Sequence, residues 1–401
     1  MNKALLAHEP TRLTRETRWV LALLSQLENG LLDIRLPDGS RRLLGSGGPK
    51  VTWEVRDEAM FSSLVTRTDL GLAETYLDGQ WESSDLVGLL VLLVNNRRAI
   101  QKVWYGHWWP LLLARLRHWR NRNSRAGSRR NIIAHYDLGN DFYRLWLDPG
   151  MNYSSALYRG DAAESLASAQ RTKQRRILER LRATPGQQVL DIGCGWGAFA
   201  ELALEEGLHC TGLTLSPAQL AWAKQRVPEA DLRLQDYRDL TGQFDHVVSV
   251  EMFEAVGERW WPAYFAAVAR ALKPGGRALI QTITIADERF NRYRKGTDFI
   301  QQYIFPGGML PSRQAFRAAA ARQGLQVVDE YAFGLDYART LAAWRSAFEA
   351  NWERIAALGF DERFRRLWRF YLCYCEAGFR TETIDVVQFE LTHAPAALPA
   401  D

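Results

Sequence analysis

A stretch with three alternating glycines carries the clearest chemical signal in this chain of 401 residues. In VLDIGCGWGAFA, residues 189–200, Asp191 lies near the end of an apolar run, Gly193, Gly195 and Gly197 follow, and a helical pattern then begins. Glycine lets the backbone turn sharply and approach a ligand that faces a helix N-terminus. The turn fits S-adenosylmethionine, because the Asp191 carboxylate can accept a hydrogen bond from the amino group of that cofactor. A dinucleotide, or a turn that serves only the fold, is the alternative.

The dinucleotide alternative rests on Gly193-x-Gly195-x-x-Ala198, which satisfies the relaxed fingerprint of that cofactor. The next expected strand leads into Ser216, however, and neither Asp nor Glu stands between Glu206 and Glu229 to bind a nicotinamide ribose. The residues therefore favour S-adenosylmethionine.

Alternating strand and helix patterns surround this turn. Strands are expected at about 188–192, 208–215, 231–235, 245–250 and 276–284, with helices at about 165–182, 197–206, 217–227 and 260–271. This alternation predicts an α/β fold, a doubly wound Rossmann-like parallel sheet with its ligand at the carboxyl ends of the strands. A turn at 272–276, a helix at 312–323, a strand at 325–332, helices within 340–380 and a last strand at 384–391 are expected to follow. The last strand should join an edge of the sheet in antiparallel sense.

The N-terminal part predicts a separate α+β domain, because a chain of this length suits two domains. Expected there are a helix at 11–28, a hairpin of strands 31–36 and 41–44, a strand at 51–55, helices at 59–65 and 71–79, and an apolar helix from about residue 85. We place this domain at 1–120, a basic linker at 121–134 and an α/β domain at 135–401.

The cysteines and the N-terminus exclude other classes of protein. The four cysteines lack metal-ligand spacing, which predicts no metal site and a reduced, cytoplasmic setting. The N-terminus has scattered charges and is not a signal peptide. The longest apolar run, 86–94, is far shorter than the roughly 20 residues of a membrane span.

The net charge of +5 is unevenly distributed. Residues 86–136 contain ten Lys or Arg, no Asp or Glu, and interleaved aromatic residues from Trp104 to Trp119. Tryptophan beside basic residues favours the headgroup layer of an anionic bilayer, so we expect peripheral association with the inner face of the membrane. Nucleic acid, or an ordinary solvated linker, is the alternative.

The chain resembles the cyclopropane-fatty-acyl-phospholipid synthases, which use S-adenosylmethionine and are related to the mycolic acid cyclopropane synthases. The matching motifs are HYDLGNDFY, YSSALY, VLDIGCGWG, LTLSPAQ, LQDYRDL, SVEMFEAVG, LKPGG, YIFPGGMLPS and GLDYARTLAAW, between residue 135 and about 345. GLAETYLDGQWE resembles the branch that acts on phospholipids. The resemblance implies a class I methyltransferase sheet in which residues 135–401 form the catalytic domain, and it leaves a homodimer open.

This resemblance also implies a cofactor site. The glycines should lie under the methionine and ribose. The further residues implied are Tyr153 and Ser154 near the methionine carboxylate, Thr214 and Gln219 on the ribose side, and Gln235, Asp236 and Tyr237, with the Tyr237 ring beside adenine. Ser216 and Gln219 also fit a helix cap, and Tyr237 also fits a core position at a strand end.

The implied reaction adds the methyl carbon of S-adenosylmethionine to the double bond of an unsaturated acyl chain in a membrane phospholipid, and a base then closes a cyclopropane ring. Related enzymes hold a bicarbonate for this step. The matching positions here are Glu254, Tyr337, the Ile283 backbone, Ser155 in place of Cys and Gln281 in place of His. These two departures bear on ring closure, so a methyl-branched or methylene product is the alternative. On this hypothesis Glu254→Gln cripples either route.

Two other functions compete with this one. A nucleic-acid methyltransferase could grip its substrate with the basic segment. The sequence lacks an Asn or Asp followed by Pro-Pro and an aromatic residue, so we expect no nucleic-acid partner. A lipid-surface protein without turnover is the second, and the retained Glu254 and Tyr337 are against it.

Overall fold

A computed structural model of the chain describes residues 13–97 and 138–395. They form two compact units, residues 13–97 with 361–381, and residues 138–360 with 382–395. The expected linker at 121–134 and most of the basic segment lie outside the described residues.

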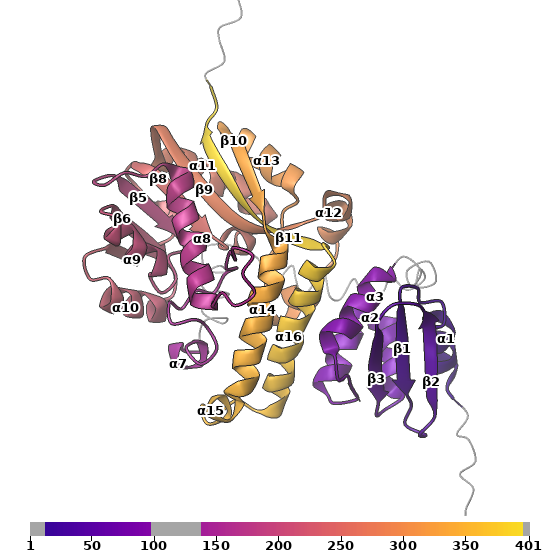
Figure 1. Ribbon diagram of the computed structural model, residues 1–401. Helices are drawn as coiled ribbons and strands as arrows, with labels where there is room; N and C mark the ends of the chain where they lie inside the picture. The colour runs from indigo at the N-terminus through magenta and orange to yellow at the C-terminus, as the bar shows by residue number, and fades with distance from the viewer. Residues whose placement is uncertain (1–12, 98–137, 396–401) are drawn as a thin grey trace, which may run out of the picture. The chain divides into compact units, whose positions relative to one another are not determined.

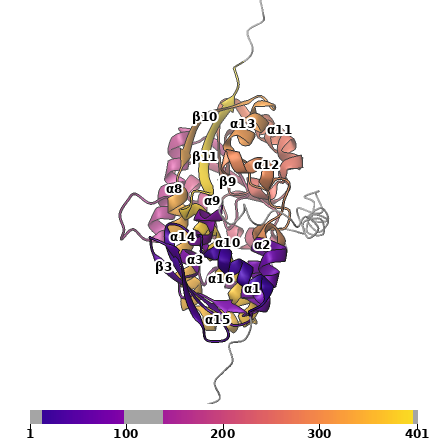
Figure 2. The ribbon, with the colours of Figure 1, turned by 90° about the vertical axis from the view of Figure 1, so that its right-hand side faces the viewer.

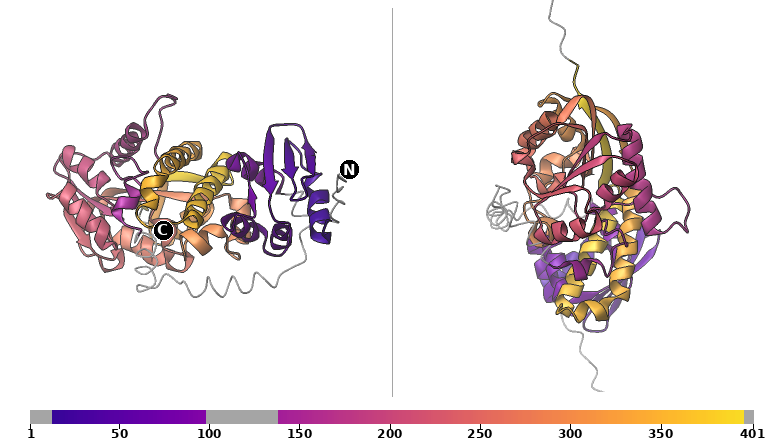
Figure 3. Two further views of the ribbon diagram at one scale, coloured as in Figure 1. Left: turned by 90° about the horizontal axis from the view of Figure 1, so that it is seen from below. Right: turned by 90° about the vertical axis from the view of Figure 1, so that its left-hand side faces the viewer.

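The first unit is a small α+β structure whose strands lie in one layer (Figures 1 and 3). Its elements are α1 (Arg15–Leu24), β1 (Gly30–Arg35), β2 (Arg41–Ser46), β3 (Lys50–Val55), α2 (Ala59–Leu77), β4 (Trp81–Glu82), α3 (Leu86–Asn95) and α16 (Glu362–Arg380). The strand order is β2-β1-β3-β4, with the predicted hairpin between β1 and β2. The two helices expected at 59–65 and 71–79 are the two parts of α2, which are separated by the non-helical backbone of Thr68 (φ 53°).

Helix α16 belongs to this first unit, although its place in the sequence predicts the α/β domain. The helix packs against α3 and α2, and one guanidinium group adds polar contacts. Arg366 donates to the carbonyl oxygens of Tyr76 (2.5 Å) and Trp81 (3.0 Å) and pairs with Glu82. The Phe370 ring lies 5.5 Å from that of Tyr76. The predicted boundary therefore misses a helix that returns to the N-terminal unit.

The second unit is the predicted α/β fold. Its strands are β5 (Gln188–Ile192), β6 (His209–Thr214), β7 (Asp231–Leu234), β8 (Phe244–Val250), β9 (Leu272–Ile285), β10 (Leu325–Ala332) and β11 (Ile384–His393). Its α-helices are α7 (Asn140–Tyr143), α8 (Leu166–Leu181), α9 (Ala198–Glu205), α10 (Pro217–Arg226), α11 (Trp261–Ala271), α12 (Asp287–Tyr293), α13 (Arg313–Ala321), α14 (Gly334–Ala350) and α15 (Trp352–Ala356). The order β10-β11-β9-β8-β5-β6-β7 confirms a doubly wound sheet, parallel from β9 to β7.

Alternate residues of the central strands fill two cores, one on each face of this sheet. Leu190 and Ile192 pack with helices α11 and α13, whereas Val189 packs with α8 and α9. Figure 2 shows α8 on one side of the sheet and α11, α12 and α13 on the other. The side-chain period of two in a strand is what allows one strand to serve both cores.

Two details of the sheet differ from expectation. Strand β11 is antiparallel as predicted, but it lies between β9 and β10, so that β10 is the edge. The turn expected at 272–276 is instead the start of β9. The register with β8 moves from Phe244↔Leu272 to His246↔Arg277, so β9 carries a bulge there, with Gly275 at φ 79°.

Candidate functional site

The glycine turn follows β5 and is hydrogen-bonded to the carboxyl end of β6. The amide groups of Gly193 and Cys194 both donate to the Leu213 carbonyl oxygen at 2.9 Å. A Cβ added to Gly193 would lie 2.9 Å from that of Met252, and one on Gly197 would lie 3.0 Å from Val227, whereas nothing lies within 4 Å of one on Gly195. Packing therefore explains two of the glycines. The third, at φ 53°, borders open space, which fits a cofactor that approaches the backbone.

Asp191 comes just before this turn. Its side chain is buried, with 3% of the residue exposed, and burial raises the pKa of Asp191 to about 7, although the charge of Lys173 opposes the rise. A buried carboxyl beside the glycine turn can accept hydrogen bonds from an amino group.

The next two strand ends carry the residues implied for the ribose and adenine. Thr214 Oγ1 donates to Gln219 Oε1 at 2.9 Å, and the backbone amide of Gln219 donates to the Ser216 hydroxyl oxygen at 3.3 Å. Ser216 is thus the N-cap of α10, as the sequence predicts. Both Thr214 and Gln219 are buried at the helix N-terminus.

After β7, Asp236 caps the short 3-10 helix η1 (Tyr237–Asp239) and pairs with Arg238. The Gln235 amide donates to the Thr214 carbonyl oxygen at 3.1 Å, which holds this strand end beside β6. The Tyr237 ring lies 5.4 Å from that of Tyr264, and its burial raises its pKa to about 12.

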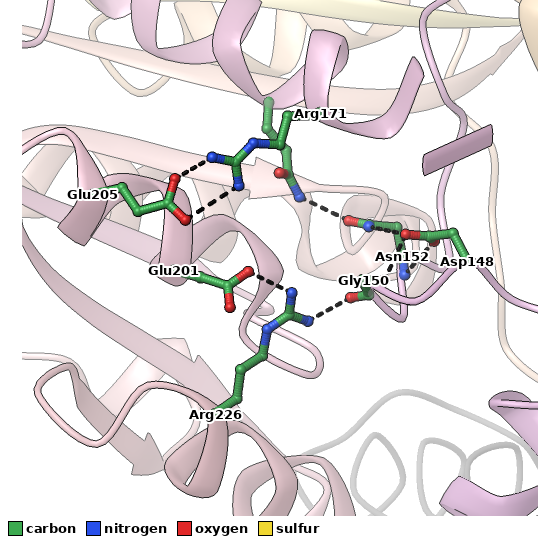
Figure 4. A network of polar contacts seen from close by, with 8 residues as sticks. Asp148, Gly150, Asn152, Arg171, Glu201, Glu205 and Arg226 are labelled. Atoms are coloured by element: carbon green, nitrogen blue, oxygen red, sulfur yellow. Dashed lines mark hydrogen bonds and ion pairs between the residues drawn. The ribbon is translucent and has the colours of Figure 1, made fainter. Parts of the chain in front are cut away.

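The segment that leads to Tyr153 is fixed by a polar network (Figure 4). Asp148 accepts hydrogen bonds from the Gly150 and Asn152 amides at 2.8 and 2.9 Å, and Gln174 donates to Asn152 at 2.8 Å. Arg226 donates to the Gly150 carbonyl oxygen and to Glu201. These contacts join the loop to helices α8, α9 and α10, and so position the residues that follow it.

Tyr153 and Ser154 follow this network directly. The Tyr153 ring lies among those of Tyr143, Trp146 and Trp344, with centroids 5.4–5.5 Å away. Ser154 accepts a hydrogen bond from the buried Lys173 ammonium at 2.7 Å. Burial lowers the pKa of Lys173 to about 8, while the negative charges of Glu251, Asp148 and Asp191 raise it.

A second cluster lies at the end of β8, next to β5. Glu251 immediately follows this strand, and its carboxylate accepts three hydrogen bonds. The donors are the Ser155 amide (2.8 Å), Gln281 Nε2 (2.8 Å) and the Tyr337 hydroxyl (2.6 Å). Because β5 and β8 lie on either side of the point where the strand order reverses, this is where an open α/β sheet binds ligands.

The sheet register explains the cluster. Val250 pairs with Gln281 of β9, and the Glu251 amide donates to the Gln281 carbonyl oxygen at 2.8 Å. The segment after Ser155 is held on α14, which carries Tyr337, because Thr340 accepts from the Ala156 amide at 3.1 Å. Three elements far apart in the sequence thus meet at one carboxylate.

The backbone of Glu251 is itself unusual. Its φ is 51°, in the left-handed region that favours glycine. A non-glycine residue in a sparsely populated region costs on the order of 1–3 kcal/mol, and such residues gather at functional sites. The chain therefore places a carboxylate here at a cost in stability.

Glu254 lies one turn further, in the 3-10 helix η2 (Phe253–Ala255). Its Oε1 accepts from the Ile283 amide, and its buried Oε2 has no partner among the described residues. Burial and, to a lesser extent, the nearby charge of Glu251 together raise the pKa of Glu254 to about 8. Burial also raises the pKa of Glu251, but its three donors and the Lys173 charge oppose that rise.

The structure brings the expected bicarbonate-binding residues together but changes their roles. The donors expected around a bound anion contact Glu251, a residue of the SVEMFEAVG motif that is not among the predicted site residues. Ser155 contributes its amide, not its hydroxyl, which donates to the Ala156 carbonyl oxygen at 2.9 Å. Of the expected set, only the Ile283 backbone contacts Glu254. Because the other three donors already bind a carboxylate, they do not fit a bicarbonate as well.

Residues 13–97 and 138–395 contain neither a set of side chains suited to a metal ion nor a membrane-spanning helix. No group of three or more His, Cys, Asp or Glu side chains there could hold a metal ion. No helix in these ranges is long and apolar enough to cross a bilayer.

Known proteins resemble this chain over most of its length. Residues 123–389 match the family described as mycolic acid cyclopropane synthetase. Tuberculostearic acid methyltransferase UfaA1 of Mycobacterium tuberculosis is 41% identical over 84% of this chain and 82% of its own length. Cyclopropane-fatty-acyl-phospholipid synthase of Escherichia coli is 37% identical over 86% of this chain and 88% of its own length.

A solved structure supports the same assignment. The crystal structure of mycolic acid cyclopropane synthase CmaA1 complexed with SAH and CTAB is 35% identical, covers 66% of this chain and 97% of its own, and has a TM-score of 0.61. The chain therefore belongs to the mycolic acid cyclopropane synthetase family and is an S-adenosylmethionine-dependent methyltransferase of the cyclopropane-synthase type.

Proposed function

We propose that this enzyme adds the methyl carbon of S-adenosylmethionine to the double bond of an unsaturated acyl chain in a membrane phospholipid and forms a cyclopropane ring. The observation that carries the proposal is one juxtaposition. A glycine that borders open space, Gly195, lies in the turn after β5, and a hydrogen-bonded carboxylate, Glu251, follows the adjacent β8. Such a site can hold a methyl donor beside a group that accepts a proton.

The cofactor, when bound, supplies an electrophilic methyl group. Gly195 would lie under it, Asp191 would accept from its amino group, and Tyr153 and Ser154 would lie near its carboxylate. Thr214, Gln219, Gln235, Asp236 and Tyr237 would surround its nucleoside. The buried positions of Asp191, Ser154, Thr214 and Gln219 support this set, since buried polar groups can bind a ligand without competition from water.

The remaining task of the protein is to protect a carbocation on the acyl chain. The rings of Tyr143, Trp146, Tyr153 and Trp344 lie next to the loop that bears Ser155. Aromatic faces attract cations, and a packed aromatic wall excludes water that would trap the cation as an alcohol. The proton that ring closure releases must then pass to a base at this site.

Membrane phospholipid is favoured as the substrate by the extent of the matches. The phospholipid synthase aligns with 86% of this chain, whereas the mycolic acid synthase structure covers 66% of it. The extra length includes part of the N-terminal unit, because the chain from residue 98 onward is shorter than the 348 aligned residues. We propose that the basic, aromatic segment brings the enzyme to the inner face of an anionic bilayer, which also supports a phospholipid substrate.

The experiment combines S-adenosylmethionine labelled with ¹³C in its methyl group with anionic vesicles whose acyl chains are monounsaturated. We expect the label in a cyclopropane methylene, with its upfield proton signals in NMR spectra of the extracted lipid. Vesicles with saturated chains are the matched control and should stay unlabelled. Label in a branched methyl or a vinylic group would establish the alternative product, and label in RNA but not in lipid would refute the proposed substrate.

A further inference from the structure

We propose that Glu251 is the base of this enzyme, and that its carboxylate takes the place of a bound bicarbonate. The inference rests on the proposed function, because it concerns the proton that ring closure releases. It follows from the contacts of the carboxylate, from its backbone and from its charged neighbours.

The donors around Glu251 form a complete anion site. One is the backbone amide of Ser155, one is the side-chain amide of Gln281 on β9, and one is the Tyr337 hydroxyl on α14. Each donor lies 2.6–2.8 Å from an oxygen of the Glu251 carboxylate. Three directed donors stabilise a charged carboxylate far more than a neutral acid, because each points its hydrogen at an oxygen. A second anion would find these donors occupied.

The Gln281 amide is oriented by its own partner. Gln281 Oε1 accepts a hydrogen bond from Gln388 Nε2 at 3.0 Å, and Gln388 in turn accepts from Arg176. The chain of contacts points the NH₂ group of Gln281 toward Glu251. A neutral donor is sufficient here because the anion is covalently attached and needs no positive charge to retain it.

The charged neighbours decide which carboxyl group is ionised. Lys173, whose charge stabilises an ionised Glu251, is buried on α8, and Tyr337 donates to Glu251 directly. Glu254 Oε1 accepts from the Ile283 amide, and Oε2 is buried without a hydrogen-bond partner among the described residues. Of two neighbouring carboxyl groups, the one with more donors ionises first, so Glu251 holds the charge and Glu254 keeps its proton.

The reaction then balances without another reactant. The electron pair of the alkene forms a bond to the methyl carbon, the carbon–sulfur bond breaks toward sulfur, and a carbocation remains on the chain. Glu251 takes one proton from the new methyl group. The electron pair of the broken carbon–hydrogen bond forms a new bond to the cationic carbon, which closes the ring. The proton then leaves Glu251 for water during turnover.

The first test needs no variant. The wild-type enzyme is assayed with labelled cofactor and monounsaturated vesicles, in buffer purged of carbon dioxide and in the same buffer with added bicarbonate. We expect equal rates of ring formation. A rate that falls severalfold on purging and returns with bicarbonate would overturn the inference, while no lipid product in either buffer would refute the proposed function instead.

The second test removes the carboxylate. Glycine suits φ 51°, so Glu251→Gly relieves strain and leaves a space among the donors of an anion site. We expect the rate to fall by about 10²-fold or more, as for loss of a general base, and to recover in part with bicarbonate or formate. In Glu251→Gln the new side chain fills this space. Its rate should fall equally, and neither bicarbonate nor formate should restore it.

The matched control is Glu382→Gly, because Glu382 is exposed and has the same φ of 51°. Its rate should equal that of the wild type with and without bicarbonate. A readout independent of turnover is binding of S-adenosylhomocysteine by calorimetry, which should persist in both Glu251 variants. Glu251 variants that bind this ligand and still form the ring at the wild-type rate would overturn the inference.

Discussion

Glu254→Gln tests the distribution of charge in the carboxyl pair. If Glu254 keeps its proton at neutral pH, glutamine imitates its protonated form, and the variant should retain ring formation within a few-fold at pH 7. The sequence alone predicts the opposite, because it makes Glu254 either the negative charge beside the cation or the residue that holds such a charge. The two predictions differ because the donors converge on Glu251.

The size of the effect on stability follows from the raised pKa of Glu254, about 8 against an ordinary value of 4.5. The folded state holds this proton to higher pH than the unfolded state, so the stabilisation is complete below pH 4.5 and is lost as the pH rises through 8. Between about pH 5 and pH 8.5 the wild type should lose on the order of 4 kcal/mol from this group, since each pH unit is worth about 1.36 kcal/mol. Glutamine does not titrate, so the variant should not share this loss.

The assay is urea-induced unfolding of variant and wild type across this pH range. The free energy of unfolding of the variant minus that of the wild type should become more positive as the pH rises. Glu179→Gln, at an exposed position of α8, is the control and should give a difference that does not change. A constant difference for Glu254→Gln, or a variant that loses stability relative to the wild type at high pH, would refute the assignment of the proton to Glu254.

Three further predictions concern the cofactor, the membrane and the loop at Ser155. Gly195→Val should abolish S-adenosylhomocysteine binding in calorimetry by filling the space beside the turn, whereas Gly186→Val, also at positive φ in an open position, should bind normally. Sedimentation with anionic vesicles should weaken with salt, because surface attraction decays over about 8–10 Å, and should drop when Arg115, Arg117, Arg120 and Arg122 are neutralised; equal sedimentation with neutral vesicles would contradict it. Thr340→Val should cost about 1–3 kcal/mol in thermal unfolding by leaving the buried Ala156 amide unpaired, and Thr340→Ser should restore most of this; equal losses would point to packing instead.

Local patterns were sufficient for several elements of the second unit. Strand β5 and the helix cap at Ser216 follow from residues within a few positions of one another, and both are confirmed. The same holds for the glycine turn at the carboxyl end of β5, because positive φ is a property of the local backbone. These features depend on short-range sterics and hydrogen bonds that a sequence displays directly.

Long-range packing decided the rest. Nothing near β11 in the sequence indicates that it inserts between β9 and β10, and nothing in α16 alone indicates that Arg366 reaches the carbonyl groups of the first unit. The glutamate at position 251 has no distinguishing neighbour along the chain. Only the register of β8 with β9, and the placement of Ser155 and Tyr337, surround it with donors. Hydrogen bonds between residues about 30 to 100 positions apart exist only when the sheet has formed, so only the tertiary structure shows that these donors surround Glu251.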